Sequence, residues 1–237
     1  MALNIQDDRG FNQGFKMTPS MEIRMKRRAD FMINNMDVNP NQSVLEIGCG
    51  RGEISFWVAD KTKKQVIGSD LCEPFIQQAL NQYKLPNLDY QILNFNSVPA
   101  NSMKFDYIIG NGILHHLYYN LDTAIENLKN LLNQNGKIIF IEPNIYNPYI
   151  TAIFKIPFLR KIANLEPDEM AFSPSFITNK LTITNFHNIQ VSYKDFLIPG
   201  IPLALVKPII FLERFAEQIP IIKNLSQSLF IVAQKAK

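Results

Sequence analysis

The chain has 237 residues and a net charge of +3, and 46% of its residues are hydrophobic and 19% are charged. These values are ordinary for a folded soluble protein of one domain with an insertion, and so weak a basic excess does not favour nucleic acid as a partner. Its 2 cysteines are too few for a disulfide-stapled secreted fold, and no apolar run reaches the roughly 18 residues that cross a bilayer.

The N-terminal segment is first polar and then helical in pattern. Residues 1–18 lack the apolar centre of a signal peptide, so we expect a flexible arm and a cytoplasmic protein. Apolar residues at helical spacing predict a helix over 20–36, which DVNPNQ ends. We interpret the basic run RMKRR at 24–28 as a solvated face of this helix, with a phosphate-contacting patch as the alternative.

Short apolar runs and helical patterns then alternate from residue 43 to residue 143. Runs that are apolar on both faces are typical of parallel strands that helices cover from both sides. Right-handed crossovers between such strands make the sheet doubly wound. The predicted strands are 43–48, 65–70, 88–93, 105–111 and 137–143, and the predicted helices are 52–62, 73–84 and 121–132.

The last third of the chain follows a different pattern. Residues 148–172 are rich in aromatic and apolar side chains, which indicates an inserted helical cap. Helices are predicted over 175–186 and 203–219, the second ended by Pro220, and strands over 188–197 and 228–235. We therefore predict an α/β fold, a doubly wound, mostly parallel seven-stranded sheet with a helical cap insertion. Its expected parts are an N-terminal arm and helix (1–40), a cofactor-binding core (41–147), the cap (148–174) and a C-terminal helix and strand hairpin with an inserted amphipathic helix (175–237).

The segment VLEIGCGRG at 44–52 puts a carboxylate just before a glycine loop. Such a loop, at the end of a first strand, lets backbone approach a ligand and leads into a helix whose free N–H groups attract an anion. Glu46 would repel a pyrophosphate and attract an ammonium or sulfonium, so the loop predicts a zwitterionic ligand; the alternative is that Glu46 bonds a backbone N–H. Asp70, after the second strand, can accept hydrogen bonds from ribose hydroxyls or cap the next helix.

Four motifs in this order and spacing resemble those of the class I S-adenosylmethionine-dependent methyltransferases. They are ExGxGxG at 46–52, Asp70, FDYIIGNGILHHL at 105–117 and NGKIIFIEP at 135–143. The resemblance covers residues 40–143 and, more loosely, 175–235. It implies this family's fold and S-adenosylmethionine as the cofactor, and it says little about the methyl acceptor.

The resemblance also implies which residues contact each part of the cofactor. The methionine part would be lined by Glu46, Gly48, Cys49 and Gly50. The ribose and adenine would be met by Asp70, Leu71, Asn94 and Phe95. The floor near the transferring methyl would be Asn111 and Gly112. Many relatives have aspartate in place of Asn94, whose amide oxygen can still accept a hydrogen bond.

The candidate catalytic residues are His115, His116 and Glu142. A hydroxyl acceptor must lose its proton, and a positioned base accelerates such a step by about 10²–10⁴-fold. Adjacent helical residues point about 100° apart, so we expect only one histidine to face the site. The alternative is that HHL packs beneath the cofactor. No metal site is predicted.

The acceptor is expected to be a small, apolar or amphipathic molecule. The polar residues of 203–219 gather on one arc of a helix, which packs on its own sheet or cap, lines an apolar pocket, or touches a membrane. Nucleic acid is disfavoured because the fourth-strand motif is GNGI, not [DN]PPY. Two other functions stay open: a nicotinamide-dependent oxidoreductase on a similar sheet, and a non-catalytic protein that retains the cofactor. The oligomeric state is also open.

Overall fold

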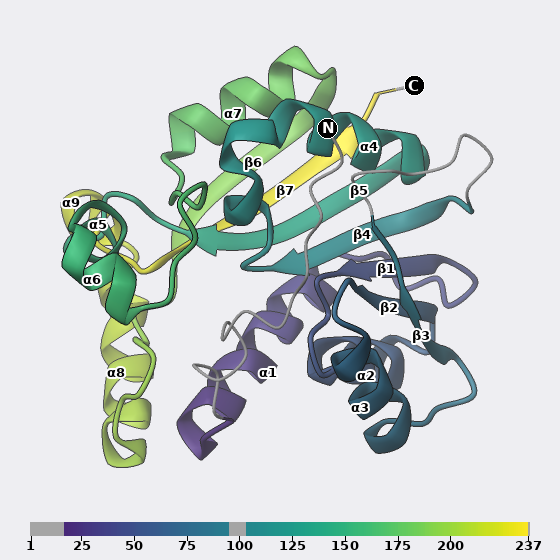
Figure 1. The fold of residues 1–237 in the computed structure, drawn as a ribbon, viewed down its shortest axis with the longest axis horizontal. Helices are drawn as coiled ribbons and strands as arrows, with labels where there is room; N and C mark the ends of the chain where they lie inside the picture. The colour runs from purple at the N-terminus through teal and green to yellow at the C-terminus, as the bar shows by residue number, and fades with distance from the viewer. Residues whose placement is uncertain (1–16, 95–102, 237) are drawn as a thin grey trace.

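The computed structural model describes residues 17–94 and 103–236, and within them the strands form one seven-stranded sheet with helices on both faces (Figure 1). The strand order is β3-β2-β1-β4-β5-β7-β6. Strands β1 to β5 run parallel, and β7 is antiparallel to β5 and β6. The predicted α/β class and doubly wound, mostly parallel sheet are confirmed. The strands are β1 Ser43–Ile47, β2 Gln65–Asp70, β3 Leu88–Ile92, β4 Phe105–Asn111, β5 Leu132–Pro143, β6 Phe186–Lys194 and β7 Ser228–Lys235.

The helices follow the predicted alternation in the first two thirds of the chain. Proline stands in the first turn of α1, α3, α5, α6, α7 and α9, where its missing N–H costs no hydrogen bond. The helices are α1 Pro19–Asn34, α2 Glu53–Thr62, α3 Glu73–Gln82, the 3-10 helix η3 Leu114–Asn120, α4 Leu121–Leu131, α5 Pro148–Lys155, α6 Pro157–Ile162, α7 Pro174–Ile183, α8 Leu203–Ala216 and α9 Pro220–Lys223.

Two hydrophobic layers sandwich the sheet because side chains alternate between its faces. Leu45 and Ile108 belong to the layer that α4 and α7 complete. Their neighbours Val44 and Ile109 belong to the layer that α1 and α2 complete. All four side chains are fully buried, which explains why the central strands are apolar without interruption.

The path of the chain locates the ligand-binding edge. From β1 the chain winds outward through β2 to β3 and then returns to β4, on the other side of β1. The carboxyl ends of β1 and β4 therefore form a topological switch point, where ligands bind in open α/β sheets. The glycine loop and the histidine pair both follow these strand ends.

Helix α1 buries part of its basic run. Arg24 and Arg28 are each 7% exposed, and both donate to Oδ2 of Asp195, over 2.9 Å from Arg24 Nε and 2.7 Å from Arg28 Nη2. The interpretation of 24–28 as a solvated face is wrong for these two residues, because both are buried and form ion pairs with Asp195, which follows β6. Lys26 does face solvent, with its side chain 49% exposed.

The segments that follow β5 and β6 gather at the carboxyl edge of the sheet. Figure 1 shows α5, α6 and α9 beyond the arrowheads of β4 and β5, with α8 projecting from them. The helix predicted over 203–219 ends earlier, at Ala216, and Pro220 begins α9 instead of ending a longer helix. No helix in the described part of the chain has the length and apolar character to cross a membrane.

Candidate active site at the carboxyl edge of the sheet

The glycine loop after β1 forms a bare backbone cradle. Gly48, Gly50 and Gly52 have φ angles of +66°, +54° and +88°, which glycine adopts without the steric cost that other residues meet. A Cβ added to Gly50 would meet no heavy atom within 4 Å, so this part of the loop borders open space. A ligand can therefore lie directly against the Gly50 backbone.

Glu46 lies buried beneath this loop. Its side chain is 2% exposed, and its Oε2 accepts a hydrogen bond from the Ser55 hydroxyl of α2. Burial raises the pKa of Glu46 to about 8, although hydrogen bonds from the Ser55 side chain and backbone act in the opposite direction. A cation bound beside this carboxyl would favour its charged form, which fits the ammonium end of the predicted ligand.

Asp70 connects the loops that follow β1 and β2. Its Oδ2 accepts from the Gly50 N–H and its Oδ1 from the Cys72 N–H, each over 2.9 Å. The N-cap of α3 is Cys72, without a side-chain capping bond, so Asp70 supports the turn before the helix. Each carboxylate oxygen can accept further hydrogen bonds, as the ribose assignment requires.

The other predicted cofactor residues occupy varied environments. Cys49 is buried against Ile76, Ala79 and Tyr90, and burial raises its thiol pKa, so it packs as a neutral side chain. Leu71 is half-buried after β2, and Asn94 is exposed after β3. Phe95 lies outside the described residues. Gly112 has a φ of +66° and follows β4.

Asn111 at the end of β4 is held from α1. Its Oδ1 accepts a hydrogen bond from Arg28 Nη1 over 2.6 Å, and its Nδ2 lies 3.6 Å from the Met25 sulfur. Helix α1 lies outside the predicted cofactor-binding core, yet it orients the side chain predicted to lie near the transferring methyl. Sequence reasoning did not identify this role of Arg28.

Glu142 anchors the start of η3. Its side chain is buried, and its Oε1 accepts from the backbone N–H groups of Ile113 and Leu114, over 3.1 and 2.8 Å. Its Oε2 lies 2.9 Å from Nδ1 of His115. A carboxylate in this arrangement compensates the free N–H groups of the helix start and fixes the orientation of His115.

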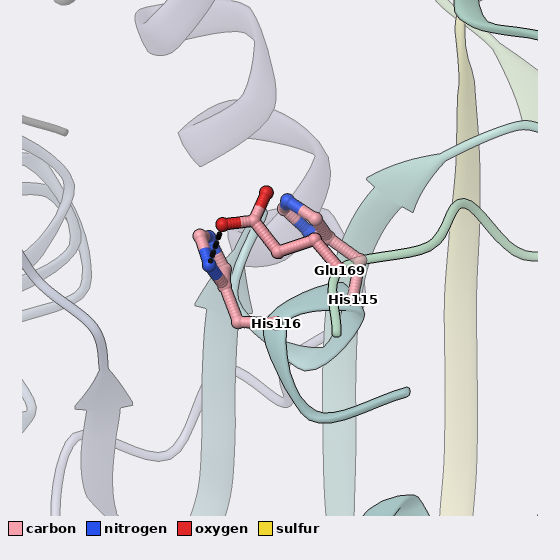
Figure 2. Close-up of side chains that lie close together, drawn as sticks. All are labelled: His115, His116 and Glu169. Atoms are coloured by element: carbon pink, nitrogen blue, oxygen red, sulfur yellow. Dashed lines mark ion pairs between the residues drawn. The ribbon is translucent and has the colours of Figure 1, made fainter. Parts of the chain in front are cut away.

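His115 and His116 converge on the carboxylate of Glu169 (Figure 2). Nδ1 of His116 lies 2.9 Å from Oε1 of Glu169, whose side chain is 1% exposed. The two imidazole centroids are 4.2 Å apart. A hydrogen bond to Glu142 and an ion pair with Glu169, and not helical spacing alone, orient the two rings. That only one histidine faces the transferring methyl group stays a prediction.

Glu169 reaches the histidines because the chain leaves and re-enters the sheet edge at neighbouring points. Asn144 after β5 forms a β-bridge with Phe172, and the Met170 N–H donates to the His115 carbonyl over 3.2 Å. Arg160 of α6 also donates from Nη1 to the Glu169 carbonyl, over 3.1 Å. The signal available in the sequence was the acidic run EPDE at 166–169, to which no role was assigned.

The charges of this cluster are unevenly distributed. Burial lowers the pKa of His116, but the interaction with Glu169 outweighs it and leaves this pKa above its ordinary value. Burial raises the pKa of Glu169, but His116 outweighs it and the net shift is downward. Burial and the repulsion of His116 lower the pKa of His115. His116 is thus the stronger base, and Glu169 is the carboxylate that stabilises its protonated form.

The same cluster has the composition of a small metal site. One potential ligand atom from each of His115, His116 and Glu169 lies within 4.8 Å of the other two. Imidazole and carboxylate ligands suit zinc and related ions. A bound metal ion is therefore the alternative use of these three side chains, for which the sequence predicted no metal.

The chemistry of the described residues suits S-adenosylmethionine. The Gly50 backbone borders open space, a buried carboxyl lies beneath it, and the Asp70 carboxylate stands at the neighbouring strand end. The Gly50 backbone offers a neutral surface for the ligand, the Glu46 carboxyl can pair with an ammonium group, and the Asp70 carboxylate can accept hydrogen bonds from hydroxyl groups. They occupy the switch point of the sheet, as the predicted assignment requires.

Comparison with known proteins gives one family match and several partial relatives. A family model described as "Methyltransferase domain" matches residues 38–182. The chain is 30% identical over 101 residues to the tRNA U34 carboxymethyltransferase of Nautilia profundicola, covering 42% of this chain and 33% of that protein. It is 35% identical over 75 residues to phosphoethanolamine N-methyltransferase 1 of Arabidopsis thaliana, covering 32% of this chain and 14% of that protein. The chain thus spans a third or less of the length of these two relatives.

Solved structures share the fold at low sequence identity. A chain in the complex between the Haloferax volcanii Trm112 methyltransferase activator and a methyltransferase has a TM-score of 0.69 and 16% identity, covering 96% of this chain and 95% of that chain. Phosphoethanolamine N-methyltransferase 2 of Haemonchus contortus, bound to phosphomonomethylethanolamine and S-adenosylhomocysteine, has a TM-score of 0.64 and 16% identity, covering 90% of this chain and 53% of that chain.

Proposed function

Because the chain belongs to the methyltransferase-domain family, within the class I S-adenosylmethionine-dependent methyltransferases, we propose that it transfers a methyl group to an O, N or C atom of a small, apolar or amphipathic acceptor. The observation that carries the proposal is the buried pair of His116 and Glu169, 2.9 Å apart at the carboxyl edge of a methyltransferase sheet. Family membership argues against the nicotinamide-dependent oxidoreductase considered from the sequence.

We assign cofactor binding to the cradle at the β1 and β2 ends. Glu46 would face the ammonium group, the backbone of Gly48–Gly50 would lie along the methionine part, and Asp70 would accept from the ribose hydroxyls. Asn111 and Gly112 would form the floor beside the methyl group. When bound, S-adenosylmethionine supplies an electrophilic methyl group on a positively charged sulfur.

We assign proton removal to His116. In its neutral form, His116 would carry its proton on Nδ1, which lies beside Glu169, and Nε2, which is buried in this structure, would be the proton acceptor. Glu169 then stabilises the imidazolium, as the raised pKa of His116 requires. A positioned base contributes about 10²–10⁴-fold, and alignment of the two reactants contributes up to roughly 7–11 kcal/mol.

His115 and Glu142 become positioning residues in this proposal. The bond from His115 Nδ1 to Glu142 over 2.9 Å fixes one tautomer, with the lone pair on Nε2. The lowered pKa of His115 favours the neutral form of this ring beside His116. A neutral ring limits the repulsion that a second imidazolium would add to the proton-accepting step.

The apolar character of the acceptor is inferred from the elements beyond the strand ends. Phe154 of α5 packs edge-on against His115, with ring centroids 5.9 Å apart. The names of the curated relatives mention tRNA, phosphoethanolamine and polyketides, which are different kinds of acceptor. The tRNA enzyme matches only 42% of this chain, so it supports the shared family more than a shared acceptor.

Transfer of isotope-labelled methyl groups tests the proposal. Purified protein with labelled S-adenosylmethionine is offered a panel of apolar phenols, amines and lipid extracts, and RNA as a separate arm. We expect label in the solvent-extractable fraction, reduced about 10²-fold or more by His116→Ala and unchanged by His187→Ala, whose histidine is exposed on β6. Label in RNA alone would overturn the acceptor class, and cofactor binding without any transfer would favour the non-catalytic alternative.

A further inference from the structure

Helix α8 has its polarity reversed relative to an ordinary surface helix, which buries apolar residues and exposes polar ones. Glu213 is 4% exposed, whereas Phe211, Leu212 and Phe215 are 59%, 61% and 56% exposed. Val206 is the only other residue of α8 that is buried among those the structure describes. The helix therefore presents its large apolar side chains to solvent.

Polar contacts fix this orientation. Glu213 forms an ion pair with Arg27 of α1, and its Oε2 accepts from the Phe196 N–H over 3.2 Å. One turn later, Glu217 forms an ion pair with Lys194 at the end of β6. Rotating α8 to bury its phenylalanines would leave the Glu213 carboxylate and its partners unpaired, which is strongly unfavourable. The apolar face is thus held outward.

The exposed apolar character continues through α9. Single exposed apolar residues are ordinary, but a large exposed apolar set marks an interaction surface. We define the α8–α9 apolar surface as Leu205, Phe211, Leu212, Phe215, Ile219, Ile221, Ile222 and Leu225, which are 37% to 81% exposed.

The charge around this surface is positive. Lys207, Arg214 and Lys223 lie within α8 and α9, while the two acidic residues of this region, Glu213 and Glu217, are engaged by Arg27 and Lys194. At about 100° per residue, Phe211 and Phe215 lie near the middle of the outward face of α8, with Lys207 and Arg214 along one flank. An apolar strip with cations along its border is typical of helices that lie in the interface of anionic membranes.

We propose that the α8–α9 apolar surface inserts into the interface of an anionic lipid bilayer, with Lys207 and Arg214 against the headgroups. The helix lies on the membrane and does not span it, in agreement with its length of 14 residues. Asn144, at the end of β5, donates from Nδ2 to the carbonyls of Asn224 and Ser226 over 2.9 and 2.8 Å, so this surface adjoins the catalytic edge. That the membrane also delivers the amphipathic acceptor rests on the proposed function.

Vesicle flotation tests the membrane contact without any acceptor. We expect the full chain to float with vesicles of roughly three parts phosphatidylcholine to one part phosphatidylglycerol, and much less with phosphatidylcholine alone or in high salt. Phe211→Ser with Phe215→Ser should weaken binding about tenfold or more. Val38→Ser with Ile183→Ser is the matched control, since these side chains are 99% and 66% exposed elsewhere on the protein.

A second variant tests the charges. Lys207→Gln with Arg214→Gln should remove most of the preference for anionic vesicles and most of the salt dependence. Each variant is checked for native S-adenosylhomocysteine affinity by calorimetry, which reports on folding.

Absence of vesicle binding, or equal loss in the Val38→Ser, Ile183→Ser control, would overturn the inference. So would a stable dimer that Phe211→Ser with Phe215→Ser dissociates, because the occupant would then be a second copy of this chain. Methyl transfer without vesicle binding would contradict only the membrane contact. Vesicle binding without methyl transfer would contradict only the proposed function.

Discussion

Arg28 of α1 donates a hydrogen bond from Nη1 to Oδ1 of Asn111 at the carboxyl end of β4, over 2.6 Å. The same guanidinium donates from Nη2 to Asp195 over 2.7 Å and to the Ser228 hydroxyl over 2.6 Å. One buried side chain therefore joins α1 to the centre of the sheet and to the C-terminal hairpin. The N-terminal helix is part of the framework of the site.

Arg28→Met should destabilise the protein by about 3 kcal/mol, because it leaves part of the buried charge of Asp195 uncompensated. Arg24 remains as a partner of Asp195 and limits the loss. Urea denaturation followed by circular dichroism measures the change. Lys26→Met is the control on the same helix, since it removes an exposed pair with Glu22 worth about 0.5 kcal/mol or less. Equal costs for the two variants would contradict a structural role for Arg28.

The sheet was predictable because its signals are local. Each central strand is a short apolar run next to a helical pattern, and this alternation predicts the α/β class. The glycine loop follows the first of these strands and predicts that the ligand binds at the carboxyl edge of the sheet. The ion pair of Arg28 with Asp195 joins residues 167 positions apart, and no local pattern pairs them. For this reason the sequence pattern alone predicted that the basic run at 24–28 is a solvated helix face.

The cluster of His115, His116 and Glu169 was predictable only in part for the same reason. His115, His116 and Glu142 belong to motifs at strand ends, and the structure pairs His115 with Glu142 and places the two imidazole rings next to each other. The position of Glu169 depends on the segment between Asn144 and Phe172, whose two ends are joined by a β-bridge. The composition of this segment does not predict that its two ends pair, and so it does not predict where Glu169 lies.

The His116 pKa should exceed the ordinary value of about 6.5 for histidine. The expected cause is Glu169, whose interaction outweighs the effect of burial. Glu169→Gln removes the negative charge and leaves the burial, so the His116 pKa should fall below its value in the unmodified protein and toward or below 6.5. Imidazole NMR signals followed over pH measure both values. An unchanged His116 pKa in Glu169→Gln would refute the pairing.

Removal of divalent metal should leave the melting temperature and the His116 titration unchanged, because the proposed base works through the direct contact with Glu169 over 2.9 Å. The measurement is thermal denaturation after dialysis against a chelator, followed by addition of zinc. A zinc-dependent stabilisation that Glu169→Gln abolishes would show instead that the His115, His116 and Glu169 cluster binds metal. In that case the proton acceptor would have to be sought elsewhere.

Cofactor binding should release protons at pH 7. With its pKa raised to about 8, the Glu46 carboxyl is mostly protonated before binding, and an ammonium group beside it favours ionisation. Calorimetry of S-adenosylhomocysteine in buffers of different ionisation enthalpy should show release of nearly one proton, and affinity should rise as the pH increases from 6 toward 8. Glu46→Gln should bind more weakly and release none. Equal proton release by this variant would assign the titration to another group.

Gly50→Ala should distinguish an effect on the stability of the fold from an effect on cofactor affinity. The φ of +54° makes alanine unfavourable by roughly 1–2 kcal/mol, yet its Cβ would meet no protein atom within 4 Å. The protein should therefore fold, while the methyl group intrudes where the cofactor would lie and reduces S-adenosylhomocysteine affinity at least about tenfold. Gly200→Ala is the matched control, because Gly200 has a φ of +77° and equally open surroundings in the loop before α8. It should lose similar stability and keep full affinity; equal affinities in the two variants would mean that the cofactor does not lie against the Gly50 backbone.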